Sequence, residues 1–204
     1  MEIGSGKLIL LGLISGLTSE VEIAREAVDR HRPSAIGLTV TAEEIEGIKR
    51  WNQGNEELPP YTDFDLYYMK QMSRFGEVRL PSPSLAFLVE FAERAGIPLV
   101  PLDMGEEEYS SLYIQNVSPI SLFFSSMFKS RRLRKKIQGS AEEVVCELDR
   151  LSMYPDGIAA VERERERHIA SEIVSHIEEN RAFLAAVNYE KAAKILKLLE
   201  DEKQ

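Results

Sequence analysis

The chain opens by alternating two short aliphatic runs with two helix-length segments, and this order constrains the fold more than any other feature. The runs at residues 8–13 and 35–40 are typical of buried strands. Each is followed by a capping box, in which a serine or threonine precedes a glutamate by three residues (Ser19 with Glu22, Thr41 with Glu44). Strands joined by a helix-length crossover favour parallel pairing. We therefore expect an α/β fold, with α+β as the alternative, in which helices cover a small, mainly parallel sheet.

Later strands are harder to find. Residues 97–102 predict one, and Pro98 and Pro101 favour an edge position or a bulge because proline donates no ladder hydrogen bond. Beyond Asp103 no segment has a convincing strand pattern, so the C-terminal half is predicted to be helical. We expect an α/β domain at residues 1–181 with a helical insertion at about 109–153, then a C-terminal helix at 182–204 that packs on the domain or on a partner.

Composition restricts the partners. A net charge of −9 opposes nonspecific binding to nucleic acid or anionic lipid, so no nucleic-acid partner is expected. No apolar run approaches the roughly 20 residues of a membrane span, and the start lacks the pattern of a secretory signal, which predicts a cytoplasmic protein. The single cysteine, Cys146, has aliphatic neighbours and is expected to be buried.

Two segments suggest binding. The turn after the first strand precedes a helix, and free amides at a helix start can bind an anion (Gly12, Ser15, Gly16, Ser19). Farther along, an apolar stretch runs into a basic one at 129–136, and both supply candidate partner-binding residues (Phe123, Phe124, Phe128, Arg131, Arg132, Arg134). Three interpretations stay open for this second segment: a helix with a buried start and a solvated end, docking on a membrane surface or protein, and self-association.

The three histidines form no pair at metal-ligand spacing, so we assign no metal site and expect no cofactor. Carboxylates could hold Mg²⁺ or Mn²⁺, which accept oxygen ligands. The alternating charges at residues 162–168 fit a solvated helix face with surface ion pairs.

Three segments, in this order, resemble the TraB/PrgY-like family of the Tiki/TraB superfamily. They are a first strand with its helix start (residues 10–15 and 19–22), a strand ending in an aspartate (residues 95–103) and a charged helix (residues 164–170). The resemblance implies an α/β scaffold and a metal-dependent hydrolase. However, Ser15 stands where the family has a histidine, Thr39 stands where a glutamate is expected, and the family's later strand with a second histidine is expected to be absent.

These departures favour a noncatalytic protein that binds or scaffolds through self-association, with a homo-oligomer as the expected state and a protein partner as a further option. One alternative is an oxygen-ligated, peptidase-like metal hydrolase, in which Glu164 and Glu166 hold the metal and Arg165 pairs with Asp103. Another is an adaptor that docks on a membrane surface or a partner through the basic helix at 129–136.

Overall fold

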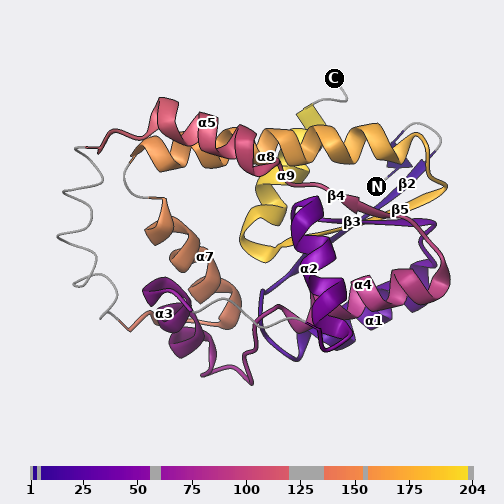
Figure 1. The fold of residues 1–204 in the computed structure, drawn as a ribbon, viewed down its shortest axis with the longest axis horizontal. Coiled ribbons are helices and arrows are strands. Elements are labelled where there is room, and N and C mark those ends of the chain that lie inside the picture. The colour runs from indigo at the N-terminus through magenta and orange to yellow at the C-terminus, as the bar shows by residue number, and fades with distance from the viewer. Residues whose placement is uncertain (1, 4–5, 56–60, 120–135, 154–155, 202–204) are drawn as a thin grey trace.

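Four parallel strands and a short antiparallel strand form one sheet in the computed structural model, which describes residues 2–3, 6–55, 61–119, 136–153 and 156–201 (Figure 1). The pairing is antiparallel only between β1 and β2. From one edge to the other, the strands are β1 (Glu2–Ile3), β2 (Gly6–Leu13), β5 (Ala182–Asn188), β3 (Ala35–Leu38) and β4 (Leu99–Pro101). The α/β prediction is confirmed, and β4 lies at an edge as its prolines predicted.

β5 corrects the expectation that no strand follows Asp103. It lies between β2 and β3, and Ala185 is in register with Leu10 on one side and Gly37 on the other. The segment expected to be a separate C-terminal helix therefore begins with a strand of the sheet, and the helix proper starts at Tyr189. The residues that directly follow this strand, Tyr189 to Lys191, include no histidine.

Helices cover both faces of the sheet. On one face, α1 (Glu20–His31), α2 (Ala42–Asn52) and α4 (Pro83–Ala95) share a core with β3 and β5. On the other face, α8 (Asp156–Ile177) and α9 (Tyr189–Asp201) share a second core with the sheet. The helix α5 (Glu106–Asn116) lies along α8 (Figure 1). A third core joins α3 (Asp63–Met72) and α7 (Ala141–Ser152) to the turn after β2.

Successive side chains of β5 alternate between the two covered faces. Phe183, Ala185 and Val187 pack towards α8 and α9, whereas Leu184 and Ala186 pack towards α1 and α4. All five are buried, as expected for a strand in a parallel sheet with helices on both sides.

The predicted helix starts are only partly as expected. Thr41 and Glu44 form the predicted capping box of α2. At α1, however, the Ser19 side chain makes no capping hydrogen bond. The prediction for Cys146 is wrong, because it lies on the exposed side of α7 while Val145 and Leu148 face the core. Within the described ranges, no helix is long and apolar enough to cross a membrane.

Candidate functional site

A cleft of about 620 Å³, here called the edge cleft, lies where the parallel strands end. Ser15 follows β2 by two residues, Thr39 directly follows β3, and Asn188 is the last residue of β5, and all three line it. In open α/β sheets ligands bind outside the carboxyl ends of the strands. The edge cleft is therefore the candidate binding site of this fold.

The edge cleft has a buried floor and an exposed rim. Thr39, Ser82 and the side chain of Ile48 form buried parts of the floor. The exposed lining residues, which form the rim, include two aromatic rings and three charged groups (Trp51, Tyr61, Glu43, Glu44, Arg50). Trp51 is 38% exposed and Tyr61 44% exposed, so a ligand in the cleft can cover ring surface that the fold leaves open to water.

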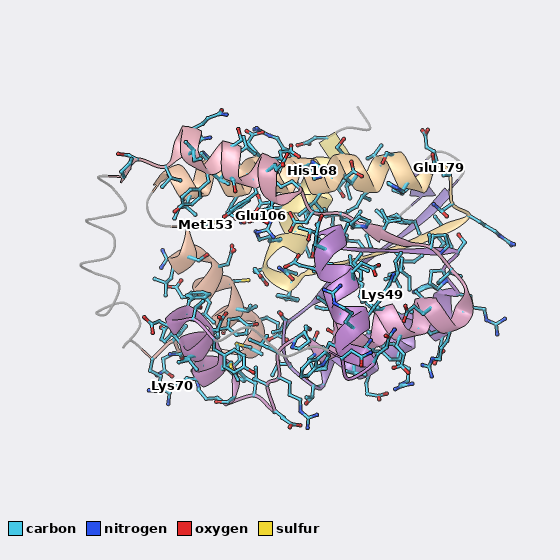
Figure 2. The ribbon with its side chains drawn as sticks, viewed as in Figure 1. Lys49, Lys70, Glu106, Met153, His168 and Glu179 are labelled. Atoms are coloured by element: carbon cyan, nitrogen blue, oxygen red, sulfur yellow. The ribbon has the colours of Figure 1, made fainter. Side chains whose placement is uncertain are left out.

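A smaller hollow of about 340 Å³, the side hollow, shares Glu43, Glu44 and Arg165 with the edge cleft. It adds Asp103, which follows β4, so all four parallel strands contribute to this edge. Glu106, at the start of α5, also lines the side hollow; Figure 2 shows it between α2 and α8, whereas Lys49 lies farther along α2.

Asp103 and Arg165 form the central ion pair of this region. Arg165 Nε donates hydrogen bonds to Asp103 Oδ1 at 2.7 Å and Oδ2 at 2.9 Å, and a second guanidinium nitrogen donates to Oδ2. The backbone N–H of Met104 donates to Oδ1 at 3.0 Å. Burial would lower the pKa of the Arg165 guanidinium, but its bonds to Asp103 raise it, so this cation stays charged. Its guanidinium also lies 5.8 Å from the Tyr109 ring centre.

Glu162 extends this network to α9. Its carboxylate accepts a hydrogen bond from Arg165 at 3.4 Å and pairs with the buried amine of Lys191. Burial would raise the pKa of Glu162, but the two cations outweigh burial and lower it. The ionised group thus ties α8 to α9 behind the edge cleft.

The other two predicted catalytic carboxylates lie elsewhere. Glu164 is on the exposed side of α8, where it pairs with Arg167. Glu166 is buried, but it contacts Lys194 on α9 at 3.0 Å. Neither lines the edge cleft or the side hollow. Across the part of the chain that the structure describes, no group of three His, Cys, Asp or Glu residues is placed to hold a metal ion.

The predicted anion-binding turn uses its amides within the fold. Gly16 N–H donates to Ser82 Oγ at 3.3 Å, and the N–H of Ile14 donates to Glu20 at 3.0 Å. Gly12 lies within β2 and packs against α9, since a Cβ there would lie 3.2 Å from Ala192 Cβ. Of the four predicted residues, Ser15 alone lines the edge cleft. The predicted partner-binding residues, from Phe123 to Arg134, lie outside the described residues.

The sequence analysis missed the residues of the rim. Trp51 lies at helical spacing from the buried Ile45 and Ile48, a pattern typical of a core position, although it is partly exposed. Glu43 and Glu44 lie in the first turn of α2, which follows β3. Their place at the carboxyl edge of the sheet could therefore have been deduced from the parallel direction of the strands alone.

A buried carboxylate lies at the start of α9, next to Asn188. Within the described residues, Glu190 Oε2 is buried and has no hydrogen-bond partner. The pKa of Glu190 is raised to about 7, mainly by burial and also by the nearby Asp149, while a hydrogen bond from its own backbone N–H, Lys191 and Lys194 oppose the shift.

No family model matches this chain, and no curated protein matches it. Among solved structures, a mutant of the erythromycin esterase EreC in its open conformation is similar, with a TM-score of 0.38 and 13% sequence identity. The alignment covers 96% of this chain and 68% of that one. A similarity at this level carries no conclusion about the fold or function of the present chain.

Proposed function

We propose that this protein is a noncatalytic binding protein that holds a small ligand in the edge cleft. The observation that carries the proposal is the position of the cleft, where three strand ends meet under the exposed rings of Trp51 and Tyr61. Ligand sites are typically concave and partly apolar, with a few converging polar groups, and Ser15, Thr39 and Asn188 supply such groups here.

The pairing of Arg165 with Asp103 supports a binding role for these two residues rather than acid–base catalysis by them. General acid or base catalysis needs a group that can exchange a proton with the substrate. Arg165 and Asp103 instead bond to each other. Among the described residues that line the edge cleft, none is a histidine or a cysteine.

The other predictions have less support. The metal hydrolase needs Glu164 and Glu166 beside Asp103, yet these two carboxylates pair with Arg167 and Lys194 instead. Self-association and the adaptor role depend on residues outside the described ranges, so they stay predictions. The relation to the TraB family and the cytoplasmic location also stay predictions.

The fluorescence of Trp51 can report ligand binding in the edge cleft, because Trp51 is the single tryptophan of the protein and lies on the rim. We would screen a library of small metabolites for a change in Trp51 emission together with a rise in melting temperature, since a ligand of the native state raises it. Compounds that change both signals should bind the Tyr61→Ala variant more weakly than the natural protein. Tyr189→Ala is the matched control, because Tyr189 is similarly exposed but does not line the cleft.

A library in which no compound changes both signals would contradict the proposal. So would hits whose affinity falls equally in Tyr61→Ala and Tyr189→Ala, because the ligand would then bind outside the edge cleft.

A further inference from the structure

Carboxylates outnumber cations around the edge cleft and the side hollow. Two residues of the combined lining are cationic, Arg50 and Arg165, whereas five are acidic (Glu43, Glu44, Asp65, Asp103, Glu106). Hollows lined by one sign of charge concentrate counter-ions of the opposite sign. The excess of carboxylates therefore favours a positively charged ligand.

The two cations do not reverse this sign. Arg165 is neutralised by Asp103 and also contacts Glu162. Arg50 has an interaction of its own and is not a free group. An anionic ligand would have to displace these contacts before it could pair with either guanidinium.

Three other carboxylates that line the edge cleft, in contrast, are not neutralised by a cation among the described residues. Glu44 accepts a hydrogen bond from the N–H of Thr41 at 2.8 Å, and Asp65 accepts from Thr62, but these donors are neutral. Within the described part of the chain, Glu43 is exposed and forms no ion pair. These three groups surround the same cleft as Trp51 and Tyr61.

Aromatic rings add a second, independent attraction for a cation. A cation over the face of a tryptophan or tyrosine is attracted by the ring quadrupole, and tryptophan is the strongest of these partners. Trp51 and Tyr61 on the edge cleft provide such faces; Tyr109, in the side hollow, already lies near Arg165.

We propose that the edge cleft and side hollow bind an aliphatic ammonium cation, with its charge near Glu43 and Glu44 and with Trp51 farther along the same cleft. The inference rests on the proposed binding function and specifies the class of ligand. The same ammonium chemistry occurs in a free polyamine and in a lysine side chain, and the experiment separates these two sources.

The test titrates the full chain with spermidine and follows Trp51 emission and binding calorimetry at low ionic strength. Removing one nearby charge should weaken binding, so we expect Glu43→Gln to lower spermidine affinity about threefold to fivefold. Glu46→Gln is the matched control, because Glu46 lies on the same helix and does not line either hollow. Arg50→Gln should tighten binding, because it removes a like charge from the rim.

Four further probes complete the experiment: inorganic phosphate, an uncharged polyol, spermine and a tetralysine peptide. Tighter binding of tetralysine than of spermine, a free polyamine with the same net charge, would identify the lysine side chain as the source. Phosphate binding that weakens in Arg50→Gln, without spermidine binding, would overturn the inference while leaving the proposed function standing. Equal losses in Glu43→Gln and Glu46→Gln would show general attraction to an acidic protein and also overturn it. If no probe or library compound changes Trp51 emission, both the inference and the proposed function fail.

Discussion

The guanidinium of Arg165 bonds to both carboxylate oxygens of Asp103, although the two residues are 62 positions apart in the sequence. Asp103 follows the edge strand β4, and Arg165 lies on α8, so this pair fixes a long helix to the carboxyl edge of the sheet. The Asp103 side chain is 2% exposed, so Arg165 supplies the counter-charge for a carboxylate that water hardly reaches.

Arg165→Gln should lower the free energy of unfolding by about 3 kcal/mol, because it leaves a buried carboxylate without its cation. Arg150→Gln is the control: Arg150 bonds Glu147 through two nitrogens in the same way, but its side chain is 75% exposed. An exposed pair of this kind contributes less than about 1 kcal/mol. Urea unfolding of both variants checks the prediction, and equal losses would contradict it.

Glu190 should make stability depend on pH. Its pKa is raised to about 7 in the fold, above the ordinary value of 4.5, so between these values the folded state keeps a proton that the unfolded state has released. Stability therefore falls as pH rises through this window, and the destabilisation is complete above pH 7. Glu190→Gln should be more stable than the natural protein at pH 8 by about 2 kcal/mol, and the difference should shrink towards pH 5.

Melting curves at pH 5 and pH 8 measure this effect. Glu200→Gln, at an exposed position of the same helix, should follow the natural protein at both values. If the Glu190→Gln variant is no more stable than the natural protein at pH 8, the Glu190 carboxylate is exposed to water in solution.

Gly37→Ala should destabilise the sheet by about 2 kcal/mol. The added Cβ would lie 2.6 Å from Phe183 Cζ and 2.8 Å from Leu102 Cδ1, so both core side chains would have to move. Gly76→Ala is the matched control, because its Cβ would lie 3.8 Å from the nearest atom, Leu17 Cδ2. A change below about 1 kcal/mol is expected there, and chemical denaturation that ranks the two the other way would contradict the packing of β3 on β5.

A fragment of residues 1–181 should not fold. It lacks β5, which pairs with β2 on one side and with β3 on the other, so its sheet would be split in two. Circular dichroism and proton NMR of the fragment test this expectation. A cooperative unfolding transition would restore the boundary at residue 181 that the sequence suggested.

The strand–helix–strand–helix opening of the fold could be predicted from the sequence because its signals are local, although β5 separates the two strands that were expected to pair. The runs around Leu10 and Ile36 are short and aliphatic, and the Thr41 capping box marks the following helix. β5 could not be predicted in the same way. Both of its faces are buried, so it has no alternation, and it contains three alanines, which are depleted in strands.

The candidate site was predictable only in part. Asp103 was found because it ends a strand, and its pairing with Arg165 was part of one hypothesis. The local charge pattern around Glu166 does not reveal that Lys194, on a helix after β5, lies beside it. Trp51 and Tyr61 come together through the meeting of α2 with the residues before α3, which no local pattern encodes.

The place of β5 in the sheet also affects how the chain is made. Ser34 and Ala182 bond across neighbouring strands although 148 positions separate them. At roughly 5–20 residues per second, a ribosome adds that length in roughly 7–30 s. During translation β2 and β3 thus wait with their facing edges open, and such edges can pair with other nascent chains. The newly made polypeptide should therefore depend on chaperones until β5 emerges and closes the sheet.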